Sequence, residues 1–209
     1  MGPFWEYCRG VFIRPRRTFA SLMGDSRRLR HGSIALLITA LLYSLTMLLL
    51  TLVGGEPAIP PLLAIPTKDY YSVQVLFMTP VMILAWLLAA GVVQLLSKPF
   101  GGNGTFEDTL SVLGFGIAAP TYATLVPDTV SGILSLIGVI TQKQWNEATT
   151  QPGLWQALAW AWLTVYMVGF LVLFPLAVAA AQRLRWRQAT FVGVVGFMVY
   201  QSMLLVFVR

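Results

Sequence analysis

Four long stretches of this 209-residue chain carry no charged side chain. They cover residues 33–53, 73–97, 155–181 and 189–208. A bilayer has a hydrocarbon core ~30 Å thick and an α-helix rises ~1.5 Å per residue, so about 20 apolar residues are enough to cross it. Each stretch is therefore predicted to be a membrane-spanning helix. Only 11% of the residues are charged, against about 25% in soluble domains, which excludes a soluble or disordered chain.

A third span is predicted between the second and fourth spans, where prolines interrupt a long apolar run. Proline removes a backbone donor and clashes with the preceding helical turn. We therefore predict a span over residues 109–127, kinked at Pro120, followed by a break at Pro127. As a helix, residues 129–142 would be only ~21 Å long, too short to cross, and this segment is predicted to be interfacial or re-entrant.

Asp128 is the acidic residue that lies inside this apolar region. Carboxylates within a membrane are costly and are candidates for ion or proton sites. The predicted position near the end of the third span favours a structural role instead, in which Asp128 caps the segment that follows. Asp128 is thus retained as a candidate intramembrane polar site, with capping as the favoured interpretation.

Basic residues indicate the orientation. In the five-span arrangement one side of the membrane holds Lys68, Lys143 and Arg209, and the other side holds the remaining eleven Lys and Arg residues. Because cytoplasmic loops are enriched in basic residues, the N-terminus is predicted to be cytoplasmic and the C-terminus outside. A sixth span over residues 129–142 would move the basic cluster at 183–187 across the membrane and is rejected.

Residues 1–32 are predicted to form a cytoplasmic, amphipathic, basic segment that precedes a membrane domain of residues 33–209. Apolar residues recur with helical spacing, and Pro15 divides them into two short helices, near 4–13 and 15–23. Such a segment is typical of a helix lying in the membrane surface; a lid over the bundle end is the compatible alternative. The predicted lipid-surface contacts are Phe4, Trp5, Arg9, Phe12, Arg14, Arg16, Arg17, Phe19, Arg27, Arg28 and Arg30. Nucleic acid is not an expected partner.

Motifs for chemistry are missing from the sequence. One histidine, His31, and one cysteine, Cys8, cannot build the usual zinc sites, and no pair of carboxylates falls on one face of a span. We therefore expect no catalytic residue, no metal and no cofactor, and the chain is not predicted to be an enzyme. The glycine-rich loop before Thr105 lacks the P-loop spacing; Thr105 and Asp108 are predicted to cap the next helix.

Small residues four apart predict close helix contacts within the chain or with a partner. The pairs are Gly114 and Ala118, Ala157 and Ala161, and Ala177 and Ala181.

Two motifs resemble the prokaryotic branch of the Yip (Ypt/Rab-interacting protein) family. One is Arg9-Gly10-Val11-Phe12-Ile13-Arg14-Pro15, with Phe19 beyond it; the other is Gly101-Gly102-Asn103-Gly104-Thr105-Phe106, which leads to Gly114 and Pro120. The resemblance implies a non-enzymatic, five-span protein of a prokaryotic cytoplasmic membrane and marks Pro15, Gly101, Gly102, Thr105, Phe106, Gly114 and Pro120 as structural. Eukaryotic relatives are linked to vesicle trafficking, but the sequence lacks their acidic tail motif, and small-GTPase binding is not carried over.

The predicted fold is thus all-α: a polytopic membrane helical bundle of five transmembrane helices with a short amphipathic N-terminal segment. The predicted function is that of a membrane organiser or adaptor that binds lipids of the anionic leaflet and other integral membrane proteins, or further copies of itself. The alternative is a channel or passive transporter for a small solute, in which the proline-broken third span lines the path.

Overall fold

A computed structural model describes residues 2–57, 62–63 and 65–208. The described residues form helices and loops, without strands. The helices are α1 (Pro3–Ile13), α2 (Pro15–Met23), α3 (Arg28–Leu52), α4 (Tyr70–Ser97), α5 (Phe106–Leu136), α6 (Gln142–Thr150), α7 (Leu154–Gln182) and α8 (Trp186–Val208), with 3₁₀ turns η1 (Thr67–Asp69) and η2 (Lys98–Phe100). The all-α prediction is confirmed.

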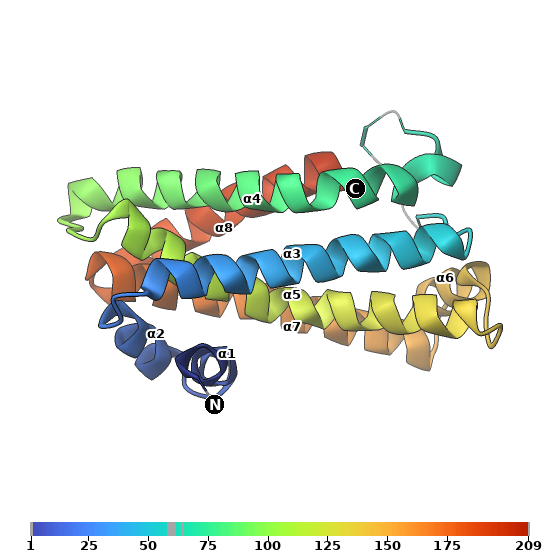
Figure 1. Ribbon diagram of the computed structural model, residues 1–209, viewed down its shortest axis with the longest axis horizontal. Helices are drawn as coiled ribbons and strands as arrows, with labels where there is room; N and C mark the ends of the chain where they lie inside the picture. Colours follow the sequence, from blue (N-terminus) through green and yellow to red (C-terminus); the bar gives the residue numbers. More distant parts are fainter. Residues whose placement is uncertain (1, 58–61, 64, 209) are drawn as a thin grey trace.

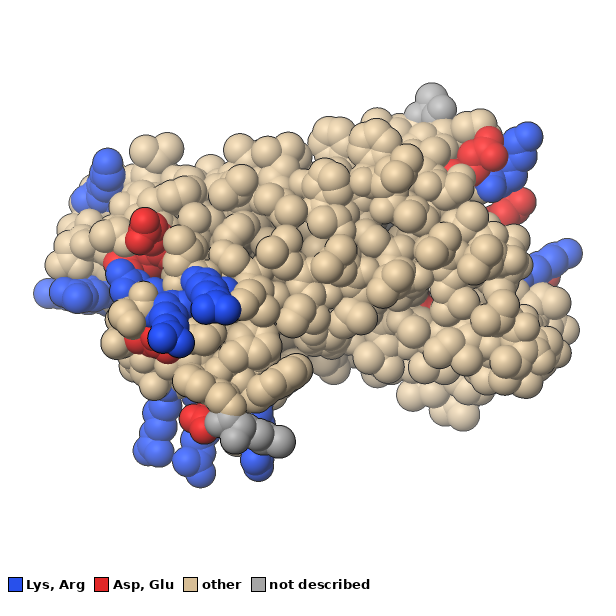
Figure 2. Space-filling model, viewed as in Figure 1, with Lys and Arg blue, Asp and Glu red and all other residues tan. Residues whose placement is uncertain are grey.

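Five helices in the described residues are long and apolar enough to cross a membrane, which confirms the predicted number of spans. They run side by side (Figure 1). One end of the bundle holds α1, α2 and the α4–α5 and α7–α8 connections, and we call it the basic end. The other end, which we call the distal end, holds the α3–α4 connection and α6. Figure 2 shows the charged side chains gathered at both ends with an uncharged band between them, the distribution that a membrane requires.

Helix α5 is the central helix of the bundle. In the most apolar 18-residue stretch of α5, 78% of the residues are buried, whereas the corresponding share in the other four spans is at most 44%. Its mean hydropathy is also lower, 1.4 against 2.1–2.3 in the others. A helix that is shielded from lipid by its neighbours does not need a uniformly apolar surface, which explains why this span is less apolar in sequence than the others.

The predicted break at Pro127 is wrong. Helix α5 continues through Pro120 and Pro127 to Leu136, so residues 129–136 extend the third span and no separate interfacial helix begins at 129. Proline is tolerated inside a membrane helix when neighbouring helices and Ser or Thr hydroxyls support the backbone. Thr121 and Thr129 both donate to backbone carbonyls of this helix, at 2.7 and 2.8 Å.

Glycines let the long helices approach closely. A Cβ added to Gly169 in α7 would lie 2.8 Å from Pro120 in α5, and one added to Gly193 in α8 would lie 2.6 Å from the Pro175 nitrogen in α7. Two helix-internal prolines therefore pack against glycines of the next helix. Members of the predicted small-residue pairs also lie inside the bundle: Ala118, Ala177 and Ala181 are buried.

The α4–α5 connection has the predicted caps. Gly101 adopts a left-handed conformation (φ 82°) that favours glycine, and Thr105 and Asp108 form a capping box at the start of α5. Asp108 also accepts a hydrogen bond from Arg28 Nε at 2.5 Å, which joins the beginnings of α5 and α3. Because α3 already begins at Arg28, the predicted boundary at residue 32 lies inside a helix.

Two features of the distal end were not predicted. Helix α6 follows α5 and begins with a capping box of Thr141 and Gln144. The C-terminal end of α8 is tied to the start of α4, because the Tyr70 hydroxyl donates to the Val208 carbonyl and Gln74 Nε2 donates to the Phe207 carbonyl at 2.7 Å.

Candidate membrane-surface site

The N-terminal segment folds into two short helices, as the sequence predicts. Helix α1 ends at Ile13, and Pro15 is the first residue of α2. Proline suits this position because its fixed φ matches the helix and its missing N–H would be unpaired there anyway. Both helices lie at the basic end of the bundle, across α5 and α7 (Figure 1).

One face of this segment packs against the bundle. Val11, Phe19 and Leu22 belong to the hydrophobic core. On α1, the rings of Phe4 and Tyr7 lie 6.0 and 6.2 Å from the ring of Phe115 in α5. This face fits the alternative prediction of a lid over the bundle end.

Asp25 fastens the same face. Its carboxylate accepts hydrogen bonds from the Arg27 backbone N–H at 2.7 Å and from the Tyr7 hydroxyl at 3.0 Å. His31 Nε2 lies 3.4 Å from it. The Arg27 hydrogen bond is the main reason that the pKa of Asp25 lies below its usual value. Desolvation and the bond to this carboxylate raise the pKa of Tyr7.

The other face of the segment is free of the bundle. Trp5 is 60% exposed and Phe12 is 63% exposed. The predicted contact residues that are also exposed are Arg9, Arg14, Arg16, Arg17, Arg27 and Arg30. Blue side chains project from this part of the surface in Figure 2. The segment therefore presents aromatic and cationic side chains together, the combination that suits a membrane interface.

Three of the predicted lipid contacts are placed otherwise. Phe19 is fully buried, so its assignment as a surface contact is wrong; its ring completes the core beneath α2. Phe4 is half-buried against Phe115 and His31. Arg28 is half-buried and paired with Asp108. Periodicity identified the apolar stripe but could not tell which of its residues face protein.

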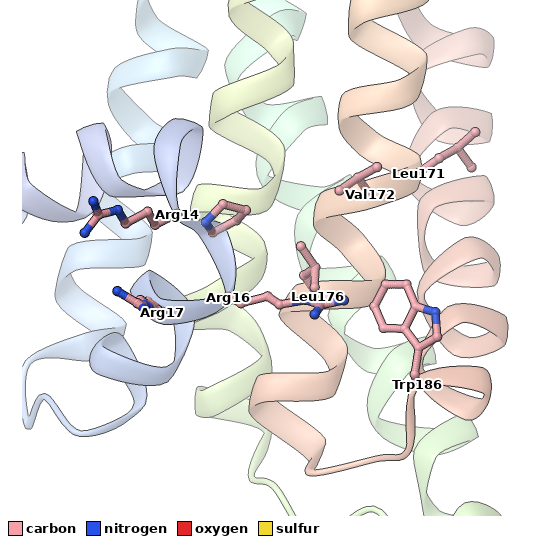
Figure 3. Close-up of a pocket in the computed structure, with 8 residues that line it drawn as sticks. Arg14, Arg16, Arg17, Leu171, Val172, Leu176 and Trp186 are labelled. Carbon is pink, nitrogen blue, oxygen red and sulfur yellow. The ribbon is translucent and has the colours of Figure 1, made fainter.

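A groove separates α2 from α7 and the start of α8. It has a volume of about 640 Å³ and is lined by Arg14, Pro15, Arg16, Arg17, Leu171, Val172, Leu176 and Trp186. The Arg16 guanidinium lies 5.4 Å from the centre of the Trp186 ring, within the range of a cation–π contact. In Figure 3 Arg16 extends into the groove towards Trp186, whereas the guanidinium groups of Arg14 and Arg17 point away from it.

The groove combines a cationic mouth with an apolar wall. Leu171 and Val172 are each 45% exposed and lie deeper in the bundle than Trp186 in Figure 3. A guanidinium binds phosphate or carboxylate oxygens through paired N–H groups. The chemistry of the groove is thus suited to an anionic headgroup beside Arg16 and an acyl chain along α7.

A second cavity lies inside the bundle and belongs to the distal half. It has a volume of about 530 Å³, and its wall includes residues from α3 to α8. Its polar side chains include Tyr43, Thr121, Thr124, Asp128 and Gln201. Asp128 lines this cavity from within α5, where it accepts a hydrogen bond from the Tyr43 hydroxyl at 3.4 Å. The prediction that Asp128 caps a new helix is wrong, because no helix begins at residue 129.

Sequence reasoning missed this cavity apart from Asp128. Its wall draws several residues from each of six helices spread over residues 43–208, and each residue by itself looks like an ordinary helix residue. The tyrosine of α3 and the threonines of α5 that line the cavity, Tyr43, Thr121 and Thr124, were the signal available. Among the described residues, no group of three His, Cys, Asp or Glu side chains could hold a metal ion.

The comparison with protein families agrees with this architecture. The model of the Yip1 domain matches residues 9–208 of the chain. The chain belongs to the Yip1 domain family. No curated protein and no solved structure matches it. Both the basic segment from Arg9 onward and the five spans fall within the Yip1 domain, which identifies an integral membrane protein.

Within the Yip1 domain, the motif residues that were predicted to be structural lie at helix ends and at contacts between helices. Pro15 starts α2, and Gly101, Thr105 and Phe106 shape the turn into α5. Gly102 lies against Ser97, where an added Cβ would be 2.7 Å from the Ser97 Cβ. Gly114 and Pro120 lie at the contacts of α5 with α3 and α7, respectively.

Proposed function

We propose that this Yip1 domain protein is a non-enzymatic membrane organiser whose N-terminal segment binds the anionic cytoplasmic leaflet of a prokaryotic membrane. The observation that carries the proposal is the outer face of α1 and α2, where exposed Trp5 and Phe12 accompany exposed arginines beside the Arg16–Trp186 groove. Each basic residue near an anionic leaflet contributes on the order of 1 kcal/mol. The buried inner face supports the view that the segment is held in place over the bundle while it contacts lipid.

The orientation follows from the same charges. Basic side chains cluster at the end of the bundle where α1 and α2 lie (Figure 2), and an excess of Lys and Arg favours the cytoplasmic side. An odd number of spans then leaves the C-terminal end of α8 outside.

A face of α7 supports an adaptor role. Of the small-residue pairs predicted to mediate helix contacts, Ala157 and Ala161 are exposed, whereas Ala177 and Ala181 are buried within the chain. An exposed small-residue face lets another membrane helix approach closely. We propose that it contacts other integral membrane proteins or a second copy of the chain; binding of small GTPases is not part of the proposal.

Lipid selectivity tests the proposed binding of the N-terminal segment to an anionic leaflet. The purified full chain in a neutral detergent is titrated with short-chain phosphatidylglycerol and phosphatidylcholine, with Trp fluorescence as the readout. Phosphatidylglycerol should bind more tightly, and Arg16→Gln should weaken that preference about five-fold, as expected for the loss of ~1 kcal/mol. Lys143→Gln is the matched control, since it removes one positive charge at the distal end. Equal binding of both lipids would contradict the proposal.

Site-specific photocross-linking tests the proposed contact of α7 with another membrane protein or a second copy of the chain. A photoreactive side chain at Ala161 should yield one discrete adduct in intact membranes. The control is Leu84 on α4, which is similarly exposed and has no small-residue face. Adducts at neither position, or the same adducts at both, would contradict the adaptor role.

The internal cavity favours a second candidate function, a passive transporter for a small solute. The supporting observation is that Thr121, Thr124 and Asp128 of α5 bring polar groups into the middle of the bundle. Liposomes containing the full chain would be assayed for solute flux, and flux that Thr124→Leu reduces would favour this function over the organiser.

A further inference from the structure

The groove between α2 and α7 holds a positive charge that no carboxylate of the described chain balances. The Arg16 guanidinium lies 5.4 Å from the centre of the Trp186 ring, and the ion pairs among the described residues do not include it. Two carboxylates at the same end, Asp25 and Asp108, are already engaged within the chain. Arg16 is therefore available to an anion that comes from outside the chain.

The ring of Trp186 directs this charge into the groove. The cation–π contact draws the Arg16 guanidinium towards the ring, whereas the guanidinium groups of Arg14 and Arg17 point away from the groove (Figure 3). A guanidinium that is held in place keeps its N–H groups for paired hydrogen bonds to two oxygens of a phosphate. The groove thus has one directed phosphate-binding group.

An exposed apolar stripe of α7 leads away from the guanidinium. Leu171 and Val172 line the groove. Val168 and Val165 continue the same face of the helix by one and two further turns, and they are 52% and 60% exposed. From Leu176 to Val165 the helix extends ~17 Å, at ~1.5 Å per residue, which is about half of a ~30 Å hydrocarbon core. The stripe therefore has the length of an acyl chain in one leaflet.

Other occupants match only part of this arrangement. A free phosphate or an acidic peptide would contact Arg16 but would leave the apolar stripe of α7 without a partner. A phosphatidylcholine would cover the stripe, but its trimethylammonium group would lie among arginines, and like charges repel. An anionic phospholipid matches both the guanidinium and the stripe.

We propose that the groove binds one anionic phospholipid as a specific ligand, with its phosphate on Arg16 and one acyl chain along α7 from Leu176 to Val165. The inference rests on the proposed function, because it names the lipid class and the place where the N-terminal segment holds it. General attraction to an anionic leaflet does not saturate at one lipid per chain, whereas this site does. The bound lipid contacts both α2 and α7 and so links the segment to the bundle.

Counting bound lipids is the first test. The full chain, freed of lipid in a neutral detergent, is titrated with dioleoyl phosphatidylglycerol, dioleoyl phosphatidylcholine or glycerol phosphate, and native mass spectrometry counts the adducts. A single phosphatidylglycerol adduct should saturate first, and it should bind at least about five-fold more tightly than phosphatidylcholine. Glycerol phosphate, which has no acyl chain, should bind at least about ten-fold more weakly than phosphatidylglycerol. Equal binding of any two ligands, or adducts that increase without saturating, overturns the proposal.

Two neighbouring arginines separate a directed contact from general attraction. Arg16→Gln should weaken phosphatidylglycerol binding about five-fold. Arg17→Gln removes the same charge from the next position of α2, but its guanidinium points away from the groove (Figure 3), and it should weaken binding by at most about two-fold. Equal effects of the two variants would assign the binding to the summed charge of the segment and overturn the site.

A second pair of variants tests the apolar wall. Val172→Trp places an indole in the groove without changing the charge, and it should weaken phosphatidylglycerol binding about ten-fold. Leu84→Trp makes the same kind of change at a similarly exposed position on α4 and should leave binding unchanged. Equal binding by these two variants overturns the proposed course of the acyl chain along α7.

The contact of the outer face with the leaflet is measured separately. A spin label attached to Phe12→Cys in a Cys8→Ser background reports whether the exposed side of α1 enters a phosphatidylglycerol bilayer. A label in the bilayer without a saturable adduct overturns the groove site and leaves the leaflet contact standing. A label in water together with a saturable adduct supports the groove site and contradicts the leaflet contact. If Val172→Trp fails to fold, the ligand series and the two arginine variants still decide.

Discussion

The backbones of Gly32 in α3 and Gly114 in α5 are in direct contact. A Cβ added to Gly114 would overlap the Gly32 carbonyl, and one added to Gly32 would lie 2.7 Å from the Ser111 Cα. Neither overlap can be relieved by rotating a side chain, because the opposing atoms are backbone. This contact sets how closely the first span packs on the central helix.

Gly114→Ala should therefore destabilise the bundle, although alanine is the better helix former. Separation of α3 and α5 to admit the methyl group should cost about 1–3 kcal/mol, the usual cost of overpacking. Gly91→Ala in α4 is the control, because nothing lies within 4 Å of its added Cβ, and it should gain about 0.5–1 kcal/mol. The midpoint of thermal unfolding in detergent measures both. Equal midpoints for the two variants would refute the close-packing argument.

Acid should release α1 from the bundle. The pKa of Asp25 is lowered in the folded protein, chiefly by the Arg27 N–H and also by Tyr7 and His31. The folded state thus binds this proton less readily than the unfolded state. The stabilisation is present above the ordinary Asp pKa of about 3.9 and is lost as the pH falls through the lower folded value.

Hydrogen exchange of α1 amides, referenced to α4 amides at each pH, measures this release. Protection of α1 should fall below about pH 4 in the unmodified chain. In Asp25→Asn it should be lower at neutral pH and should lack the acid transition. Asp69→Asn, an exposed carboxylate before α4, should behave like the unmodified chain. An acid transition that survives in Asp25→Asn would assign the pH dependence to another group.

A buried amide network at the basic end should be essential for stability. Gln182 Nε2 in α7 donates to Gln94 Oε1 in α4 at 2.6 Å and to Thr109 Oγ1 in α5 at 2.7 Å. Gln182→Leu removes the donor and should cost about 1–3 kcal/mol because buried polar atoms lose their partner. Gln188→Leu, a partly exposed glutamine in the first turn of α8, is the control for unfolding experiments. A midpoint for Gln182→Leu equal to that of the control would contradict the network's role.

The sequence predicted those features that depend on local physics. Uncharged length identified the spans, Pro15 divided α1 from α2, and Thr105 with Asp108 gave the cap of α5. The course of α5 beyond Pro127 depends on neighbouring helices that support the backbone, so local rules predicted a break that tertiary packing overrides.

The exposure of residues in the candidate membrane-surface site depends still more on tertiary structure. Helical periodicity placed Phe12 and Phe19 on the same apolar stripe, but one is exposed and the other is buried. Which face of each short helix contacts protein depends on how α1 and α2 pack against α5 and α7. Trp186 stands beside a basic cluster in the sequence, but its contact with Arg16 joins segments 170 residues apart and has no local signal.

Topology provides the last prediction. In a Cys8→Ser background, single cysteines replace Ser26, between α2 and α3, and Thr150, at the end of α6; both side chains are exposed. A membrane-impermeant thiol reagent added to intact cells should label the Thr150 variant. The Ser26 variant should react only after the membrane is permeabilised, because an end of the bundle with eleven basic residues is expected to face the cytoplasm. Labelling of both variants from one side would contradict the five-span arrangement. The reversed pattern would place the arginine-rich face of α1 and α2 against the outer leaflet. The proposed contact with the anionic cytoplasmic leaflet could not then occur.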